Sequence, residues 1–446
     1  MYLGIDIGTT KAAAVIADGE RRLLAVESRA HGADLPAPPG RAEQDAAALL
    51  EAAWAAVRAL PPDLRRQVRA VGLTGQMHGV VILDEAGEPI SPLVTWQDGR
   101  CLEGGFLDEL SARTGCVLRT GFGCATLAWL KRHGSMPEGA AAASTIHDLA
   151  AARLGGQARP VTDPTDAASW GLFDLPDLFW NADAVAAAGV DLALLPPVDA
   201  CGSRAGEVSA ERAARLGIPA GVPVAVAIGD NQASLLATLR DPEREVALTL
   251  GTGGQVSVVL AADAAINWRE RPVTFEYRPY PGGRLAVVGA SLCGGAAWAW
   301  LAEAVASWMG DVGAPAPARE DLFAKLNALG LAAADSLIVR PHFLGERHDP
   351  HRRGAIEGID LGNFRLGSVA RGLARGILAN LHDMLPAWAL AGRERVVGSG
   401  NALRLSPLLQ RMAEETFGLP LVLTEGREEA ALGAAILAGG LAGLGE

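Results

Sequence analysis

The chain has 446 residues, of which half are hydrophobic and a fifth are charged, with a net charge of −12 and a pI near 5.3. This composition is globular, its length allows two or three domains, and its acidity excludes a general nucleic-acid or anionic-membrane binder. The five cysteines are scattered without a CxxC pair, which indicates a reducing compartment and no structural zinc. The start, MYLGID, lacks the pattern of a signal peptide, so we expect a cytoplasmic protein with neither nucleic acid nor membrane as a partner.

The first motif is the opening MYLGIDIGTTK, in which a short apolar run carries one carboxylate, Asp6, and leads into Gly8, Thr9, Thr10 and Lys11. A glycine turn between two strands can present backbone N–H groups and hydroxyls to a phosphate. A carboxylate directly before such a turn is well placed to hold Mg²⁺. The alternative is an ordinary amino-terminal hairpin in which Asp6 caps its own turn.

The elements that follow are typical of an α/β domain. Strands are expected over Ala12–Ala17 and Arg22–Ser28, on either side of an Asp-Gly turn. Gln44–Leu60 has the apolar spacing of an amphipathic helix, and Val68–Thr74 returns to strand. Three strands, a helix and another strand form the opening of a ribonuclease-H-like fold.

Polar side chains gather at both ends of the segment 74–100, which we expect to form a hairpin. They are Gln76 and His78 at one end and Asp98 and Arg100 at the other, with Trp96 as a flat apolar face. Such donors and acceptors suit a polyhydroxylated ligand, and the two groups together predict a sugar site. A lone histidine such as His78 is, however, more often a structural residue.

Three later segments are polar and dotted with glycine, which suits loops around a cleft. They are Thr120–Thr126 (TGFGCAT), Thr145–Leu149 (TIHDL) and Thr162–Gly171 (TDPTDAASWG). Structural alternatives stay open for individual residues, with Asp148 as a helix cap, Asp166 as a turn residue and Trp170 in the core.

Asp230 is the candidate catalytic base. Val222–Ile228 reads as a buried strand and runs directly into the segment GDNQAS, residues 229–234. A carboxylate on a glycine turn that opens a helix can accept a proton from a bound hydroxyl, as aspartates do in kinases. The alternative is an aspartate that only caps the following helix.

The second half of the chain repeats the opening design. Glu245–Leu260 reads as strand, glycine turn and strand, with Gly251, Thr252 and Gly253 in the turn. Such a repeat predicts two similar domains, 1–240 and 241–446, each with a phosphate-binding hairpin that faces the cleft between them. A third glycine turn, which contains Gly398, Gly400 and Asn401, can approach an adenosine closely, and a helix over Glu428–Gly439 is expected to pack behind it.

In this order, the three glycine turns and Asp230 resemble the FGGY carbohydrate kinases, a family within the actin, hexokinase and Hsp70 ATPase superfamily, over essentially the whole chain. GQMHG at Gly75–Gly79 is similar to the ketose kinases, such as the xylulokinases. Further segments resemble the sedoheptulokinase branch: LVTWQDGRC (Leu93–Cys101), TGFGCAT, TIHD, AASWG (Ala167–Gly171), LGERH (Leu344–His348) and NLHDMLP (Asn380–Pro386).

The resemblance implies two ribonuclease-H-like domains, with ATP, Mg²⁺ and a sugar meeting in the interdomain cleft. It implies that sedoheptulose and MgATP give sedoheptulose 7-phosphate, with Asp230 as general base and Asp6 near the metal. It places the phosphates at Gly8–Lys11 and Gly251–Gly253, and adenosine at Gly398, Gly400 and Asn401. It places the sugar at Gln76, Met77, His78 and Asp98, with Trp96, Arg100 and Gln232 beside them. GTGG stands where many members have GTS, so no side-chain hydroxyl contact is expected after Thr252.

Three alternatives remain open. They are another ketose or polyol kinase, a non-catalytic sugar-responsive regulator on the same fold, and an actin-like filament or chaperone ATPase. Retention of Asp230 argues against the regulator, and the two sugar-type clusters argue against the filament or chaperone. The sequence allows a monomer or a homodimer.

Overall fold

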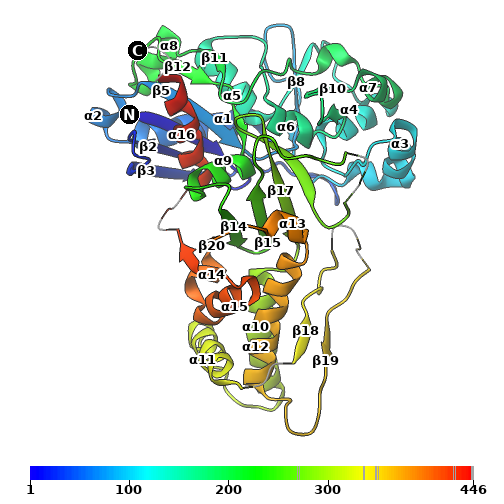
Figure 1. Cartoon of the computed structure of the whole chain (residues 1–446). Helices are drawn as coiled ribbons and strands as arrows, with labels where there is room; N and C mark the ends of the chain where they lie inside the picture. The colour runs from blue at the N-terminus through cyan, green and yellow to red at the C-terminus, as the bar shows by residue number, and fades with distance from the viewer. Residues whose placement is uncertain are drawn as a thin grey trace. The chain divides into compact units, whose positions relative to one another are not determined.

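The computed structural model describes residues 1–268, 270, 272–334, 337–346, 349, 351–424, 426 and 428–442. The described chain forms two compact units (Figure 1). The first unit comprises Met1–Ala237, Pro279–Gly283 and Gly426–Glu446, and the second comprises Thr238–Arg278 and Arg284–Glu425. This division reflects only which parts of the chain pack together. The domain boundary that the sequence predicts at residue 240 therefore stays a prediction.

The first unit is built on a seven-stranded sheet with the order β11-β12-β5-β1-β2-β3, in which β13 also pairs with β5. The strands β1, β2 and β3 form an antiparallel meander, whereas β5, β12 and β13 run parallel to one another and to β1. Their bounds are β1 (Tyr2–Ile7), β2 (Lys11–Ala17), β3 (Leu23–Ala30), β5 (Ala70–Gly75), β11 (Arg204–Glu207), β12 (Pro223–Ala225) and β13 (Ile228–Gly229). The ribonuclease-H-like opening predicted from the sequence is confirmed.

Side-chain alternation along β2 gives the sheet two apolar faces. Ala12, Ala14 and Ile16 join the core that contains Leu49, Ala53 and Val57 of helix α1 (Ala46–Ala59). Ala13, Val15 and Ala17 point the other way and pack against helix α16 (Glu429–Ala442). A strand with a side-chain period of two is therefore buried on both faces.

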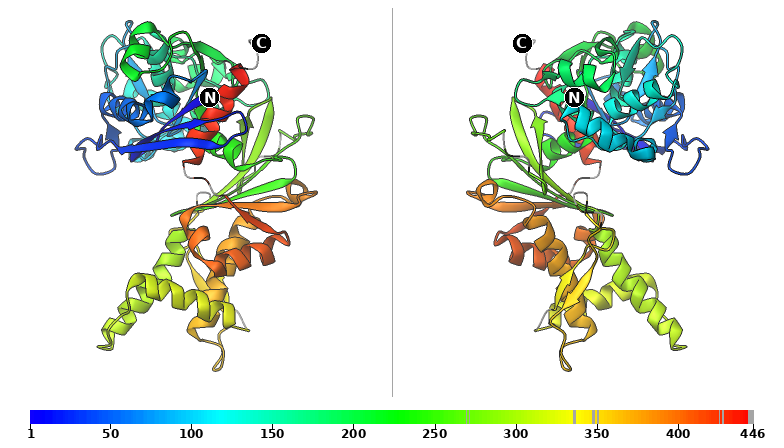
Figure 2. Two further views of the ribbon diagram at one scale, coloured as in Figure 1. Left: turned by 90° about the vertical axis from the view of Figure 1, so that its left-hand side faces the viewer. Right: turned by 90° about the vertical axis from the view of Figure 1, so that its right-hand side faces the viewer.

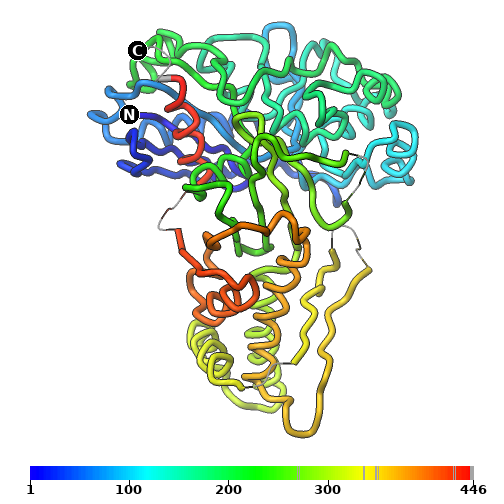
Figure 3. Tube along the Cα trace, viewed as in Figure 1, coloured from blue at the N-terminus to red at the C-terminus, as the bar shows by residue number. Residues whose placement is uncertain are grey.

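Helix α16 packs against the strands that begin the chain, as the red helix beside the blue strands shows in Figures 1, 2 and 3. Glycines permit this close approach, because a Cβ atom on Gly4 would lie 1.9 Å from the Ala431 carbonyl oxygen and one on Gly72 would lie 2.0 Å from that of Ala434. The expectation that this helix packs behind the adenosine turn is wrong, because it belongs to the first unit.

The remaining elements of the first unit include the helices α3, α4 and α7, which surround a second apolar core. The hairpin expected over residues 74–100 is reduced to isolated bridges, since β6 pairs with β8 and β7 pairs with β4. The strands are β4 (Glu43–Gln44), β6 (Val81–Leu83), β7 (Leu93–Val94), β8 (Ala142–Ser144), β9 (Phe173–Asp174) and β10 (Phe179–Trp180). The helices are α2 (Pro62–Arg65), η1 (Arg100–Gly105), α3 (Phe106–Thr114), α4 (Gly123–Arg132), α5 (Ile146–Gly155), α6 (Pro164–Ser169), α7 (Ala182–Ala188), η2 (Leu192–Leu194), α8 (Ala210–Leu216) and α9 (Asp230–Thr238).

The second unit repeats the same strand order. Its six-stranded sheet runs β16-β17-β15-β14-β20-β21, in which the last five correspond to β3-β2-β1-β5-β12 of the first unit. The strands are β14 (Glu245–Leu250), β15 (Gly254–Val259), β16 (Glu276–Tyr280), β17 (Arg284–Ser291), β20 (Arg395–Ser399) and β21 (Leu421–Leu423), with β18 (Ile338–Arg340) and β19 (Ala355–Glu357) as a separate pair. The helices are α10 (Gly295–Asp311), α11 (Arg319–Ala332), α12 (Leu366–His382), α13 (Ala387–Leu390), α14 (Asn401–Leu405) and α15 (Pro407–Phe417). Among the described residues, none of these helices has the length and apolar character needed to cross a membrane.

Candidate active site

Three strand ends of the first unit meet at one edge of its sheet. Ile7 at the end of β1 and Gly229 at the end of β13 both pair with Gly75 at the end of β5. Gln76 and Asp230 come directly after these ends, and helix α9 begins at Asp230, as the sequence predicts. The carboxyl ends of parallel strands are the usual place for a site in an open α/β sheet.

Asp6 lies on β1 beside this edge and is partly buried. Its Oδ1 atom is fully buried and has no hydrogen-bond partner among the described residues. Burial raises the pKa of Asp6 to about 8, and the charges of Asp230 and Glu428 act in the same direction, against Lys11. A carboxylate oxygen that is buried without a donor suits a hard divalent cation.

The first glycine turn follows Asp6. The Gly8 amide donates to the Lys11 carbonyl over 3.0 Å and closes the turn between β1 and β2. The Trp96 indole N–H donates to Thr9 Oγ1 over 3.0 Å, which connects this turn to the second sugar-type cluster. The Lys11 ammonium forms an ion pair with Glu428, and Thr10 is exposed.

Gln44 joins the glycine turn to the first sugar-type cluster, and the sequence analysis did not find it. Its Nε2 atom donates to the Thr9 carbonyl and to Asp34 Oδ1, both over 2.8 Å. Its Oε1 atom accepts a 2.8 Å hydrogen bond from Gln76 Nε2. The sequence places Gln44 at a helix start, but the structure places it on β4, ahead of the helix cap Asp45.

The first cluster consists of Gln76, Met77 and His78. Gln76 is buried, and its Oε1 atom has no hydrogen-bond partner among the described residues. The Met77 side chain lies against Gly229, where a Cβ atom would come within 2.7 Å of the Met77 methyl group. The motif therefore adjoins the residue that precedes Asp230.

His78 adopts a positive φ of 74° and is held by two residues of predicted loops. Its amide donates to Ser169 Oγ, and its Nδ1 atom lies 2.7 Å from the Ser169 carbonyl oxygen. Because a carbonyl only accepts, Nδ1 carries a proton. Phe122 stacks on the imidazole at 4.9 Å between ring centroids.

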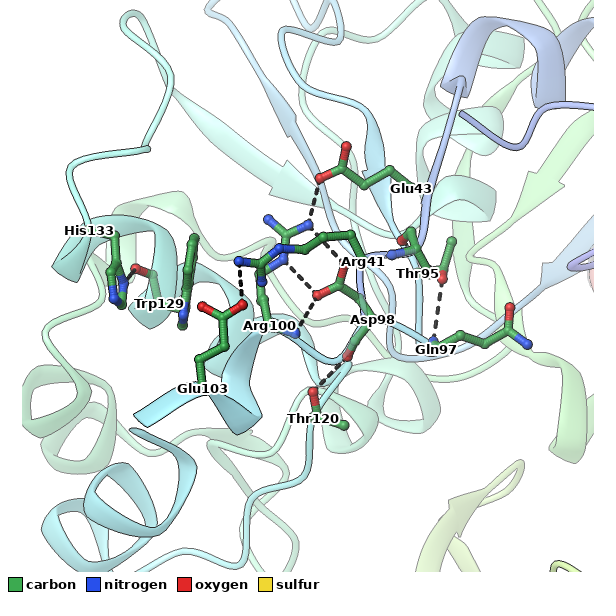
Figure 4. A network of polar contacts seen from close by, with 11 residues as sticks. Arg41, Glu43, Thr95, Gln97, Asp98, Arg100, Glu103, Thr120, Trp129 and His133 are labelled. Atoms are coloured by element: carbon green, nitrogen blue, oxygen red, sulfur yellow. Dashed lines mark hydrogen bonds and ion pairs between the residues drawn. The ribbon is translucent and has the colours of Figure 1, made fainter. Parts of the chain in front are cut away.

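Asp98 and Arg100 form a buried ion pair (Figure 4). Asp98 accepts from the Arg100 amide, Nε and Nη2 and from the Ala42 amide, over 2.7 to 2.9 Å. Burial alone would raise the pKa of Asp98, but these hydrogen bonds lower it. Arg100 also donates to Glu43, so both side chains are used within the protein and hold the loop that carries the half-exposed Trp96.

Gln232 is fully buried, and its Nε2 atom donates to the Pro279 carbonyl over 3.2 Å. This contact joins α9 to a distant segment of the first unit. The structure thus brings Asp6, Gln76, Met77 and Asp230 to one sheet edge, with Trp96 at the glycine turn. The Oε1 atom of Gln232 lies beside Gly229 at this edge and has no hydrogen-bond partner among the described residues. Asp98 and Arg100 instead bind each other.

A buried acidic cluster lies beside this edge. His147, Asp148 and Asp166 offer ligand atoms that all lie within 4.8 Å of one another. His147 Nε2 and Asp166 Oδ2 are 2.7 Å apart, which is the distance of a direct hydrogen bond. Burial raises the pKa of Asp148 to about 8. The cap of helix α5 is Thr145, so Asp148 is not the helix cap that its structural alternative predicts. Trp170 is in the core, as its structural alternative predicts.

The second unit carries the other two glycine turns. Gly251, Thr252 and Gly253 connect β14 to β15, and amides at the start of helix α10 hold their carbonyl oxygens. The Gly295 amide donates to the Gly251 carbonyl over 2.8 Å, and the Ala296 amide donates to that of Thr252 over 2.9 Å. This supporting segment is not among the predicted site residues, although the paired glycines at positions 294 and 295 were an available signal.

The predicted adenosine turn lies next to the second phosphate turn. Gly398 pairs with Leu248 across β20 and β14. Gly400 has a φ of 88°, and a Cβ atom there would lie 2.3 Å from the Leu250 carbonyl oxygen, which excludes a larger residue. Asn401 opens α14. In the motif LGERH, residues 347 and 348 lie outside the described residues.

Comparisons with known proteins show the family of the chain. The model of the FGGY family of carbohydrate kinases, N-terminal domain, matches residues 1–237, and that of the C-terminal domain matches residues 246–441. Sedoheptulokinase from Homo sapiens is 34% identical and that from Mus musculus is 35% identical, each over 98% of this chain and 96% of the relative. Glycerol kinase from Thermus brockianus is 30% identical over 97% of this chain and 88% of its own length.

Solved structures show the same fold. The crystal structure of xylulose kinase from Rhodospirillum rubrum has a TM-score of 0.84 at 28% identity and covers 98% of this chain and 89% of that one. The crystal structure of gluconate kinase from Lactobacillus acidophilus, at 22% identity, has a TM-score of 0.82 over 99% and 89% of the two chains. With both family models and relatives of 30% identity or more matched over nearly the whole length, the chain belongs to the FGGY family of carbohydrate kinases.

Proposed function

We propose that this sugar kinase transfers the γ-phosphate of MgATP to the terminal hydroxyl of sedoheptulose, which gives ADP and sedoheptulose 7-phosphate. The observation that carries the proposal is the position of Asp230. It opens α9 directly after Gly229, which pairs with Gly75, the residue that leads into the Gln76–His78 motif. A carboxylate and the ligand-type side chains of one motif therefore share a sheet edge. The similarity to two sedoheptulokinases supports the choice of sugar.

In the proposed reaction, Asp230 accepts the proton of the sugar hydroxyl as its oxygen attacks the γ-phosphorus. The new O–P bond forms while the bond to the β-phosphate oxygen breaks, and ADP leaves with that oxygen. Gln76 and His78 would hold the sugar, with the buried Oε1 of Gln76 as an acceptor for one of its hydroxyls. Positioning and a general base are the main contributions that protein groups make to phosphoryl transfer.

We assign the nucleotide to the three glycine turns. Backbone groups of Gly8–Lys11 and Gly251–Gly253 would contact the phosphates, and Gly398, Gly400 and Asn401 would line adenosine. Asp6 fits Mg²⁺, because its buried Oδ1 has no donor among the described residues. When bound, Mg²⁺ would neutralise phosphate charge.

We propose that the remaining predicted sugar residues support the site without contacting the sugar. Asp98 and Arg100 hold the loop that presents Trp96, and Gln232 fixes α9 through Pro279. The flat, half-exposed face of Trp96 would then be the direct contact from this loop.

A sugar panel tests the proposal. Purified protein with MgATP is supplied with sedoheptulose, xylulose, glycerol or gluconate, and ADP release is followed. We expect sedoheptulose to give the highest kcat/KM. Asp230→Asn should lower kcat by about 10²–10⁴-fold, the usual contribution of a general base, with binding of both substrates retained. Asp191→Asn is the matched control, because Asp191 also caps a helix start, that of η2, and belongs to none of the segments assigned to the site.

Each of the other outcomes of this test would favour one of the alternative functions. A preference for xylulose or glycerol would assign another ketose or polyol kinase. Sugar binding in calorimetry without any phosphorylation would assign a sugar-responsive regulator. ATP turnover that no sugar stimulates would assign an ATPase of another kind.

A further inference from the structure

The short helix α6 contacts both the catalytic segment and the sugar-type motif. At its first turn, Thr165 Oγ1 accepts a 2.9 Å hydrogen bond from the Gly229 amide, one residue before Asp230. At its last residue, Ser169 binds the amide and the ring of His78. Because both contacts come from one helix of six residues, α6 sets the spacing between Asp230 and His78.

Asp163 fixes the direction in which the Thr165 hydroxyl points. The hydroxyl lies 2.6 Å from Asp163 Oδ1, which also accepts the Thr165 and Asp166 amides over 2.9 and 3.1 Å. Because two backbone N–H groups already point at Oδ1, this oxygen is an acceptor and the Thr165 hydroxyl donates to it. The lone pairs of Thr165 Oγ1 are then left for the Gly229 amide.

Burial makes this chain of hydrogen bonds important. Asp163 and Thr165 are almost completely buried, so water cannot replace a lost contact. The Gly229 backbone also has little room to move, because Met77 packs against it on one side and Gly75 pairs with it on the other. A Gly229 amide without an acceptor would therefore shift the start of α9.

We propose that Thr165 is a positioning residue for phosphoryl transfer, whose hydroxyl, oriented by Asp163, fixes the Gly229 amide and thereby the place of Asp230 relative to the Gln76–His78 motif. This inference rests on the proposed function, in which Asp230 accepts the proton of the sugar. Thr165 itself touches neither substrate. Its contribution is the geometry of the base, and a misplacement of about 1 Å is enough to cost about 10²-fold in rate.

The test compares four proteins: wild type, Thr165→Val, Thr165→Ser and Thr145→Val. Valine keeps the shape of threonine but removes the acceptor, and serine restores it. Thr145 is an equally buried threonine whose hydroxyl accepts the Asp148 amide over 3.1 Å, so Thr145→Val removes the same kind of hydrogen bond elsewhere. We measure kcat, both KM values and Tm for each protein.

We expect Thr165→Val to lower kcat at least about tenfold with both KM values within about threefold. Thr165→Ser should recover kcat to within about threefold of wild type, and Thr145→Val should lower Tm but keep kcat within the same range. The inference is overturned if Thr165→Val keeps wild-type kcat, if serine fails to rescue it, or if both valine variants lose kcat in proportion to Tm.

Two measurements keep the inference testable in every case. If Thr165→Val does not fold, hydrogen exchange of the Gly229 amide in wild type decides, since exchange as fast as in an unstructured peptide would overturn the proposed hydrogen bond. If wild type phosphorylates no sugar, the proposed function fails, and that result is visible before any variant is compared.

Discussion

The carboxylate of Asp6 lies among charges that oppose its own ionisation. Its pKa is raised from 3.8 to about 8, chiefly by burial and then by Asp230 and Glu428. Between these two pH values, the folded protein holds a proton that the unfolded chain has released. Stability without metal therefore falls as pH rises through this window.

We predict that Asp6→Asn raises the Tm of the metal-free protein relative to wild type, by an amount that grows between about pH 5 and pH 8. Asparagine keeps the shape and cannot ionise, so the energy needed to bury the charge disappears. Melting curves in a chelator at both pH values check this. Addition of MgATP should narrow the gap, because it should stabilise wild type more than the variant. A gap that does not depend on pH would contradict the prediction.

We expect substitutions of His78 and of Asp98 to have different effects, although both residues were expected to contact the sugar. His78→Ala removes the imidazole ring that would contact the sugar and should lower kcat/KM for sedoheptulose at least about tenfold, while the KM for ATP changes less than about threefold. Asp98→Asn weakens a buried ion pair, so it should lower Tm at neutral pH. Because hydrogen bonds lower the pKa of Asp98, that loss of Tm should shrink as the medium becomes acid. If His78→Ala lowers Tm without a sugar-selective defect, His78 is a structural residue.

The site residues that the sequence predicts are those with a recognisable pattern in the residues next to them. Asp6 precedes a glycine turn, and Asp230 stands between a buried strand and a helix. Gln44 and Thr165 could not be found in this way. Each acts through a hydrogen bond to a residue far along the chain, Gln76 or Gly229, and neither has a local signature.

Helix α16 shows how an element can be predicted correctly and placed wrongly. After Glu429 its residues are only Ala, Leu, Ile and Gly, so no polar stripe indicates which face is buried or which partner covers it. Its partner is determined by Gly4 and Gly72, where the strand backbones lie open to the helix. The two sheets were more predictable, because alternation along the strands and the repeated glycine turns are local patterns.

We predict that Gly72→Ala destabilises the protein by about 1–3 kcal/mol or more, since its Cβ atom would lie 2.0 Å from the Ala434 carbonyl oxygen and the backbone of α16 would have to move. Gly19→Ala is the matched control, because nothing lies within 4 Å of a Cβ atom there. Its effect should stay within about 0.5 kcal/mol. Denaturant unfolding of both variants measures the difference. Equal stability of the two would show that α16 does not pack closely on β5.

The two units repeat one strand order but carry different groups. The first unit supplies Asp6, Gln76, His78 and Asp230, and the second supplies two glycine turns that lie against each other at Leu250 and Gly400. The repeat in the sequence indicated the common fold. It could not indicate that the last helix of the chain completes the first unit, because that depends on packing between the two ends of the sequence.

We therefore predict that a fragment of residues 1–240 does not fold stably alone. Without α16, the face of β2 formed by Ala13, Val15 and Ala17 would be exposed to water. The same fragment joined through a flexible Gly/Ser linker to residues 426–446 should be soluble and should melt cooperatively, because α16 can return to the sheet. Circular dichroism melts and size-exclusion profiles of the two fragments test this. A fragment of 1–240 that melts as cooperatively and at the same temperature as the linked fragment would show that α16 is not part of the folded first unit.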